Sequence, residues 1–550
     1  MRVSVRAIAG GAALALTLGA CGVLPGGDPS GDPTSSERGG TVIIGGCQPG
    51  NPLVPAATNE VCGGNPLNAI FSMLVRYDPQ TGEAVNDVAQ SITSEDNKVW
   101  RIELEPGWTF HDGSPITASS FVDAWNWGAH GANAALSQNS YFYSIIEGFE
   151  EVQGDTDEDG NFVPGTAADT MSGLEVINDT TFEVTLKQAE AGFPQRLGYI
   201  AYAPLPETFF DAGTTPEDFG ASPIGSGPFE FVEFVQGERI VLEAYEGYQG
   251  EVRPNVDGVT FEIFENQDAQ YASLLADQVD VMTQLPTSAL AGEAYKTDLG
   301  DRYIEQETGV IHMMGFPSED ADPNLADPRV RQAISMSIDR QLIIDNIFQG
   351  IREPASSWVS PVVDGYTDGQ CGDFCTFNPD RARELLAETD FDGELTITYN
   401  EDGDHETWVN ATCNNIKNVL EIECTPQGTP TLAGVLDDLI AGELTGMFRI
   451  AWQMDYPSIE NFLGPLYQTG AGANFFGHNV EQFDSLIAEA SGQNGEQSVA
   501  LFQEAERMLA QTMPTVPLWF NLTVAGYSTR VDNVIITPFG TVDLLSISVE

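Results

Sequence analysis

Histidine is the side chain most often used for acid–base chemistry near neutral pH, and this chain contains five. They are His111, His130, His312, His405 and His478, and none belongs to an HExxH zinc motif. No GxSxG elbow or P-loop occurs, and no GxGxxG turn follows a strand-like segment. A glycosidase-like pair of carboxylates stays open, since the chain is rich in acids and spacing singles out none. These patterns predict a protein that is not an enzyme and uses no cofactor.

One acidic stretch has the spacing of a cation site. Residues 155–160 read Asp-Thr-Asp-Glu-Asp-Gly, and alternating oxygens before a glycine turn are typical of a calcium loop. The twelfth position, where a glutamate should close the cage, is Thr166. We therefore expect a solvated surface loop and no metal site, although calcium binding here stays open.

Seven cysteines are present, and six remain once Cys21, the residue expected to carry a lipid, is set aside. An even number suggests disulfides in an exported chain, and six cysteines allow 15 connectivities. A zinc site is the alternative, but the spacings are irregular and no histidine lies near Cys371 and Cys375. Pairing between sequence neighbours is the simplest arrangement: Cys47–Cys62, Cys371–Cys375 and Cys413–Cys424.

The charge balance is extreme, with 82 acidic residues against 22 basic ones and a net charge of −60. A surface this negative repels phosphate backbones and anionic lipid headgroups, so nucleic-acid binding is excluded. We interpret the charge as a source of solubility or salt tolerance. A preference for cationic ligands is the alternative, which overall charge does not establish.

Strand-like and helix-like segments alternate along the whole chain and must position any site. This mixture predicts an α/β architecture, and 550 residues predict two or more lobes. The expected strands are 41–46, 99–104, 181–186, 240–244, 259–264 and 516–522. The expected helices are 330–348, 381–388, 406–420, 435–441, 480–490 and 496–511.

The N-terminus is typical of a bacterial lipoprotein signal. Arg2 and Arg6 precede an apolar stretch, residues 7–18, which is too short to span a bilayer and ends in Leu-Gly-Ala before Cys21. An ordinary secretory signal is the alternative. Residues 22–40 are rich in Gly, Pro and Ser and predict a flexible stalk. We expect an exported protein whose lipid on Cys21 is its sole anchor to the outer face of the cell membrane.

Six blocks of the sequence carry a resemblance: WRIEL at 100–104, GWTFHDGSPITA at 107–118, PIGSGPF at 223–229, DPRVRQAI at 327–334, IDR at 338–340 and NPDRA at 378–382. Together they resemble the peptide/nickel class of periplasmic solute-binding proteins, which includes the oligopeptide binders of ABC importers. One departure is Ser120, where the family usually has aspartate, and we expect this serine to cap a helix.

The resemblance implies a two-lobed α/β clamp, the type II periplasmic-binding-protein fold, with an extra subdomain inserted in lobe 1. It also implies a monomer that closes over a small ligand and delivers it to ABC permease subunits. The implied parts are a signal peptide at 1–20, a tether at 21–40, lobe 1 at 41–70, 204–308 and 520–550, the subdomain at 71–203, and lobe 2 at 309–519.

The segment RIAWQMDYP at 449–457 resembles the family's segment in which an aspartate pairs with the α-ammonium of a peptide, and Asp455 stands in that place. A buried ammonium needs an opposite charge, because an unpaired buried ion costs several kcal/mol. The alternative is that Asp455 only caps a helix that begins near Ser458.

The resemblance also implies cations for the carboxylate end of a peptide. Arg449 and His405 match an arginine and a histidine with that task, although each has a structural alternative. Arg449 can neutralise an internal acid, and His405 can lie solvated at a helix start. Phe348 and Ile440 stand where the enteric oligopeptide binder has further basic residues, so the preferred peptide length stays open.

In the same resemblance, the middle of a peptide pairs with main chain, which ignores side-chain identity. Ala451 and Gln453 would supply this backbone, Trp452 a wall, and the Cys47–Cys62 segment the opposing edge. Asn474 would orient groups near Asp455. The family also binds sugars, nickel chelates and opines, so these ligands are the alternative. A peptide-sensing role stays open too. A secreted hydrolase does not fit the family blocks.

Overall fold

The computed structural model describes residues 39–157, 161–401 and 405–550. The predicted signal peptide, Cys21 with its predicted lipid, and all but the last residues of the predicted tether lie outside these ranges. So do residues 158–160 of the predicted acidic loop. No helix in the described part is both long and apolar enough to cross a membrane, and no cluster of three or more His, Cys, Asp or Glu there could hold a metal ion.

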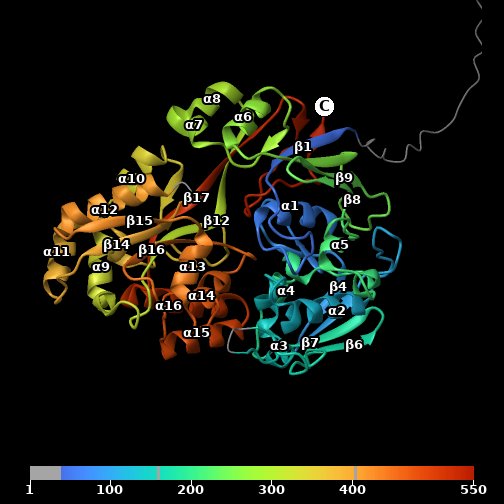
Figure 1. The fold of residues 1–550 in the computed structure, drawn as a ribbon, viewed down its shortest axis with the longest axis horizontal. Coiled ribbons are helices and arrows are strands. Elements are labelled where there is room, and N and C mark those ends of the chain that lie inside the picture. The colour runs from blue at the N-terminus through green and yellow to red at the C-terminus, as the bar shows by residue number, and fades with distance from the viewer. Residues whose placement is uncertain (1–38, 158–160, 402–404) are drawn as a thin grey trace, which may run out of the picture. The chain divides into compact units, whose positions relative to one another are not determined.

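A mixed sheet of eleven strands runs through the described residues (Figure 1). The short strand β13 (Arg352–Pro354) pairs with β17 beside the main path. Along that path the order is β15 (Cys424–Thr429), β14 (Leu395–Asn400), β16 (Met447–Gln453), β12 (Tyr303–Gly315), β17 (Thr515–Tyr527), β11 (Val281–Met282), β1 (Thr41–Gly46), β10 (Gly258–Ile263), β9 (Arg239–Ala244) and β8 (Phe229–Val235).

Two large hydrophobic cores divide the chain into two lobes although the sheet is continuous. The core of the first lobe is built mainly from residues between Val42 and Phe261, and the core of the second from residues between Ile311 and Phe520. A smaller cluster between Tyr271 and Leu299 covers the junction with α6 (Gln267–Leu275), α7 (Thr287–Leu290) and α8 (Ala294–Leu299). The predicted two-lobed α/β fold is confirmed.

A separate four-stranded sheet forms the subdomain of the first lobe, in the order β4 (Ala89–Thr93), β5 (Val99–Leu104), β7 (Thr181–Thr185) and β6 (Leu174–Asn178). Helix α2 (Ala118–Ala129) packs on β6 and β7, and Ser120 accepts a hydrogen bond from the Thr117 N–H at 3.1 Å in a capping box. The other first-lobe elements are α1 (Val61–Ile70), β2 (Val75–Tyr77), β3 (Ala84–Asn86), α3 (Phe149–Gln153), α4 (Phe193–Arg196), α5 (Pro216–Gly220), β18 (Val531–Asp532) and β19 (Ser548–Val549).

The helices of the second lobe surround β14, β15 and β16 (Figure 1). They are α9 (Pro328–Met336), α10 (Arg340–Ile347), α11 (Pro379–Ala387), α12 (Glu406–Leu420), α13 (Leu432–Ile440), α14 (Ile459–Tyr467), α15 (Glu481–Ser491) and α16 (Gly495–Thr512). The expected strands and most expected helices are confirmed within one to three residues at their starts. The single helix expected at 330–348 is wrong, because Asp339 accepts the Leu342 N–H and starts a second helix.

Strands β12 and β17 connect the two lobes and pair with each other along most of their length. Their register shifts between Glu307 and Ile311, so the ladder is interrupted where β12 passes from one lobe to the other. Gly309 lies in this interruption, and its N–H donates to the Pro538 carbonyl at 2.9 Å. A side-chain carbon at Gly309 would lie 2.3 Å from the Met454 sulfur, so any larger residue here would displace the buried Met454 side chain.

The six cysteines form three disulfides between sequence neighbours: Cys47–Cys62, Cys371–Cys375 and Cys413–Cys424. The last one ties buried Cys413 of α12 to the first residue of β15. It closes a loop with a sequence separation of 11 residues.

Replacing both Cys413 and Cys424 with alanine should lower the free energy of unfolding of the second lobe by about 3 kcal/mol, because the unfolded chain regains loop entropy. Urea denaturation followed by fluorescence measures this loss. The matched double replacement of Cys371 and Cys375 should cost about 2 kcal/mol, since its loop is shorter. An unchanged denaturation midpoint in the first variant would contradict the structural role of this disulfide.

Candidate ligand-binding site

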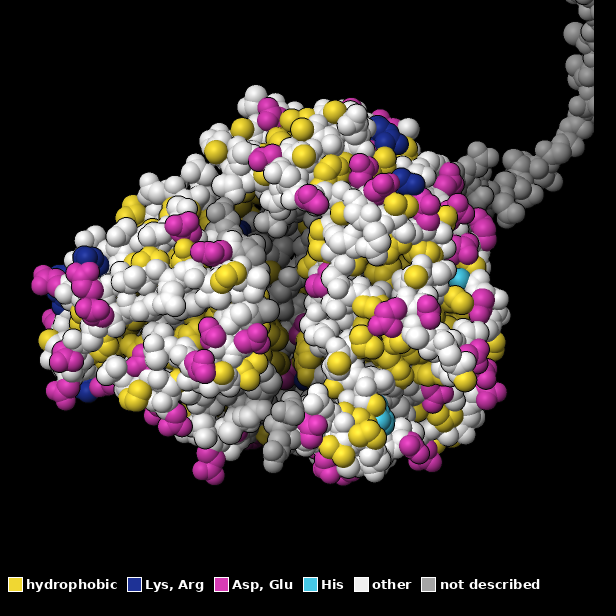
Figure 2. Space-filling view, viewed as in Figure 1, with side chains coloured by type: hydrophobic (Ala, Val, Ile, Leu, Met, Phe, Trp, Pro, Cys, Tyr) yellow, Lys and Arg dark blue, Asp and Glu magenta, His cyan; other side chains and the backbone are white. Residues whose placement is uncertain are grey.

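A cavity of about 710 Å³ lies between first-lobe residues near α1 and α4 and the end of β16. The face in Figure 2 is hollowed between the two halves of the described chain, and acidic side chains far outnumber Lys and Arg on it. Three of the predicted site residues line the cavity: Trp452, Gln453 and Asp455. From the first lobe, the residues opposite include Thr58, Asn59, Glu60, Val61, Tyr77, Tyr141 and Tyr199.

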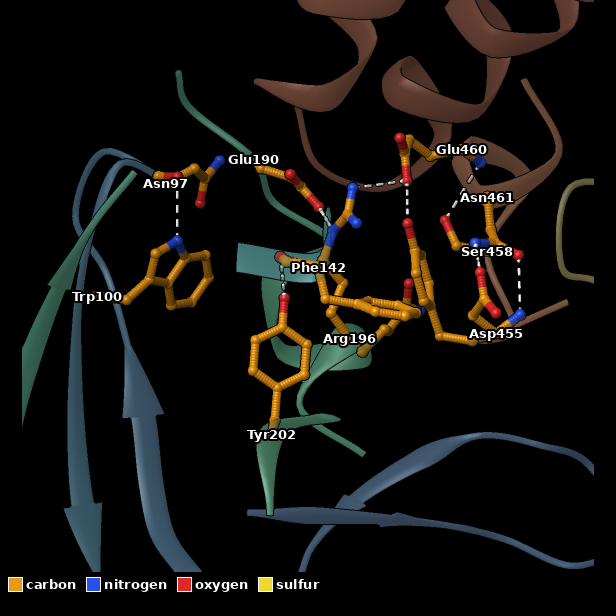
Figure 3. Close-up of polar contacts among 12 residues, drawn as sticks. Asn97, Trp100, Phe142, Glu190, Arg196, Tyr202, Asp455, Ser458, Glu460 and Asn461 are labelled. Carbon is orange, nitrogen blue, oxygen red and sulfur yellow. Dashed lines mark hydrogen bonds and ion pairs between the residues drawn. The ribbon is translucent and has the colours of Figure 1, made fainter. Parts of the chain in front are cut away.

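The carboxylate of Asp455 is held by Asn461, which lies in the first turn of α14 (Figure 3). The Asn461 Nδ2 donates to Asp455 Oδ2 at 3.1 Å, and the Asp455 N–H donates to Asn461 Oδ1 at 3.0 Å. The same Oδ1 accepts the indole N–H of Trp452 at 3.2 Å. One fully buried amide therefore fixes both the acid and the tryptophan.

Loss of hydration in the cavity raises the pKa of Asp455 to about 7. The hydrogen bond from Asn461 and the charge of Arg196 lower this pKa, and the charge of Glu460 raises it. Desolvation, followed by the charge of Asp455, also raises the pKa of Tyr77 and of Tyr199. Among the described residues no Lys, Arg or His forms an ion pair with Asp455, so a cation from outside would stabilise its charged form.

The main chain of β16 offers a free edge beside this acid. Strand β14 pairs with β16 only at Met447 and Phe448, whereas β12 pairs with it as far as Gln453. The Met454 N–H donates to the Gly309 carbonyl on β12, so in antiparallel alternation the N–H and C=O groups of Ala451 and Gln453 point the other way. This edge can pair with an extended chain.

Cationic side chains gather on the second lobe around His312 of β12. Burial, followed by the positive charges of Arg352, Arg449 and His405, lowers the pKa of His312 well below its ordinary value. Arg449 Nη1 donates to Asn400 Oδ1 at 3.3 Å, and His405 Nδ1 accepts the indole N–H of Trp408 at 3.2 Å. The predicted pair Arg449 and His405 thus lies in one electrostatic group, and neither residue is among those that line the cavity.

Arg352 is a basic residue of this group that sequence reasoning missed. Its guanidinium lies 5.1 Å from the ring centre of Phe348, one of the two positions where a basic residue was noted as missing. The buried Nε of Arg352 has no hydrogen-bond partner among the described residues, and burial lowers the pKa of Arg352 to about 10. Ile440, the other such position, is 75% exposed.

The family profile of bacterial extracellular solute-binding proteins, family 5, matches residues 83–474. The chain belongs to this family. The resemblance found in the sequence blocks is therefore confirmed.

Individual relatives resemble this solute-binding protein over most of its length. The oligopeptide-binding protein OppA of Bacillus subtilis is 25% identical over 485 residues, which cover 85% of each chain. The heme-binding protein A of Haemophilus influenzae is 27% identical over 401 residues, covering 69% of this chain and 70% of the relative. The periplasmic binding protein DppA of Helicobacter pylori, solved with the peptide STSA, matches in fold with a TM-score of 0.75 at 18% identity, covering 94% of this chain and 99% of that one.

The structure does not bring Asn474 to Asp455. Asn474 instead donates to the carbonyls of Gln468 and His478 at 2.9 and 2.7 Å and holds its own turn. Asn461, and not Asn474, therefore orients the carboxylate of Asp455. An available signal was its position three residues after the helix-capping Ser458, in the first turn of a helix that directly follows the acid.

Replacing Asn461 with leucine should move the pKa of Asp455 upward from about 7, because the variant loses the amide that stabilises the carboxylate. Carbon-detected NMR of labelled aspartate measures this pKa directly. Asn474→Leu is the matched control and should leave the pKa of Asp455 unchanged. Equal effects of both replacements would contradict the assignment of Asn461.

Proposed function

We propose that this protein captures short peptides between its two lobes and delivers them to an ABC importer. The observation that carries the proposal is Asp455, a carboxylate in the cavity that no cationic side chain in the described part of the chain pairs with. A free α-ammonium is the ligand group that such a carboxylate stabilises most directly. Neutral sugars need no acid at this place.

The free edge of β16 supports an extended main chain as the next part of the ligand. Ala451 and Gln453 present backbone donors and acceptors, and Trp452 forms a wall of the cavity. Thr58 to Val61, which lie in the loop closed by the Cys47–Cys62 disulfide, face them from the first lobe. Three to five extended residues span roughly 10–16 Å, and main-chain pairing makes recognition tolerant of side chains.

The cationic group on the second lobe supports capture of the peptide carboxylate. Arg449, His405 and Arg352 surround His312, and guanidinium forks match a carboxylate in shape and charge. Relatives that are named oligopeptide-binding proteins support a peptide as the ligand. In the same proposal, the protein binds the peptide and delivers it without changing it chemically.

The remaining parts of the proposal concern attachment and division of the chain. The lipid on Cys21 would tether the monomer to the outer face of the membrane through residues 21–40. The subdomain would span 71–203 and lobe 2 residues 309–519, with lobe 1 made of the segments between and around them. The crossings of β12 and β17 between the lobes support the bounds of lobe 2.

Asp455→Asn should weaken binding of free-amine peptides by several kcal/mol, because the ammonium would lose its only paired charge in a desolvated site. Calorimetry with a mixed tripeptide library, after native mass spectrometry has identified co-purified peptides, measures the loss. Asp543→Asn is the matched control: Asp543 lines the same cavity, but its carboxylate accepts the backbone N–H groups of Leu545 and Ser546. N-acetylated peptides should bind weakly to all variants, and equal affinity of wild type for acetylated and free peptides would remove the assignment.

The affinity for free-amine peptides should also depend on pH. Asp455 becomes protonated below its pKa of about 7, whereas the α-ammonium of a peptide loses its proton above about 8. Affinity should therefore be highest between these two pKa values. At pH 6 and below it should fall about tenfold per pH unit, because Asp455 must lose a proton before it pairs with the ammonium. Calorimetry from pH 5 to 9 tests this, and Asp455→Asn should flatten the acidic limb. An acidic limb that persists in the variant would assign the dependence to another group.

A further inference from the structure

Arg196 at the end of α4 lies between two carboxylates from different lobes (Figure 3). Its Nε donates to Glu190 Oε1, and its Nη2 donates to Glu460 Oε2 at 3.0 Å. The hydroxyl of Tyr456 donates to the same Glu460 oxygen at 2.7 Å. The guanidinium carbon of Arg196 lies 4.7 Å from the centre of the Tyr456 ring, so a single aromatic residue contacts both ions.

This ion group is buried. The side chains of Arg196, Glu190 and Glu460 are only 10%, 12% and 11% exposed, whereas those of most other ion pairs in the described chain are a third or more exposed. Burial alone would lower the pKa of Arg196, but the carboxylates of Glu190 and Glu460 raise it well above its ordinary value. Buried pairs are much less screened than surface pairs, and removal of one member leaves an uncompensated charge.

The group joins the two lobes. Arg196 follows Phe193 and precedes Leu197, which belong to the first core, whereas Glu460 lies between Ile459 and Phe462, which belong to the second. Tyr456 comes from the second-lobe segment but packs in the first core. Two further contacts accompany the ions: the Ala191 N–H donates to the Ser491 carbonyl at 2.6 Å, and Asn97 Nδ2 donates to the Gly492 carbonyl at 3.2 Å.

The same short segment carries the ligand-binding acid. Asp455 precedes Tyr456, and Asn461, which holds Asp455, follows Glu460. We propose that Arg196 is a latch for the closed arrangement of the lobes and a positioning residue for Asp455, acting through Glu460 and Tyr456 on the segment 455–461. The latch itself stands without a peptide ligand, and its link to amine recognition rests on the proposed function.

Charge balance explains why the latch and the ligand would act together. Arg196 faces three carboxylates, those of Glu190, Glu460 and Asp455, so the closed site has an excess of negative charge. A ligand ammonium at Asp455 reduces this excess at the moment the lobes close. A neutral ligand does not, and closure over it would leave the repulsion between Glu460 and Asp455 in place.

The experiment combines the variants Arg196→Gln, Glu460→Gln and the double variant with stopped-flow peptide binding. The single variant Arg196→Gln should raise the dissociation rate constant about tenfold or more and change the association rate constant little, because loss of a buried pair acts after encounter. The double variant should be no worse than Arg196→Gln alone, since both changes remove one interaction. Arg101→Gln, which breaks a half-exposed pair with Glu183 inside the first lobe, is the control and should leave both rates unchanged.

Two further measurements separate a latch from a general loss of stability. The pKa of Asp455, read by NMR, should rise in Arg196→Gln and fall in Glu460→Gln, because these residues act on it with opposite signs. Small-angle scattering of the ligand-free proteins should give a larger radius of gyration for both variants than for wild type. Glu460→Gln keeps the shape and a hydrogen-bond acceptor for Tyr456, so it tests the proposal even if Arg196→Gln does not fold.

The outcomes are distinct. Independent, additive effects of the two replacements, or shifts of the Asp455 pKa in the same direction, would overturn the latch and positioning roles. An unchanged radius of gyration in both folded variants would do the same. If wild type binds no peptide at all, the proposed function fails, while the scattering and NMR measurements still decide the latch.

Discussion

A carboxylate that has lost much of its hydration is stable in its charged form only when donors or cations replace the lost water. Within residues 39–157, 161–401 and 405–550, Asp455 has one amide donor from Asn461 and no paired cation, and its pKa is raised to about 7. The surrounding structure follows from this constraint. Asn461 is itself oriented because its oxygen accepts two N–H groups, which directs its Nδ2 donor to the carboxylate of Asp455.

The free strand edge and the carboxylate of Asp455 lie side by side because they belong to the same few residues. The backbone N–H and C=O groups of Ala451 and Gln453 point away from β12, whereas the Met454 N–H donates to β12. Asp455 follows directly at the end of the strand. A ligand that pairs with this edge therefore meets the carboxylate at one end. At the other, Arg449 directly follows Met447 and Phe448, the residues of β16 that pair with β14.

The long strands β12 and β17 allow this site to lie between two separate cores. An unbroken ladder between β12 and β17 would resist bending. The register shift beyond Glu307 removes hydrogen bonds of this ladder where β12 passes from one lobe to the other. The lobes are then held by contacts outside the sheet, among which the buried group of Arg196 is the most strongly charged. The loss of hydration on burial offsets much of the attraction in such a group, so its net contribution to stability is small.

The sequence by itself determined the family, the mixed architecture, most helices and strands, and the part of the chain that carries Asp455, Trp452 and Gln453. These depend on local periodicity and on motifs contiguous in the chain, such as the block at 449–457. The break at Ser337–Asp339 was missed because the apolar spacing continues across it, while the capping bond of Asp339 is a local competition that periodicity does not describe. Only the tertiary structure decided that Asn461 and not Asn474 holds the acid, that Arg352 joins Arg449 and His405, and that Arg196 meets Glu460 across 264 positions of sequence. Contacts of that kind arise from the relative placement of two cores, and no spacing in the chain encodes the distance between them.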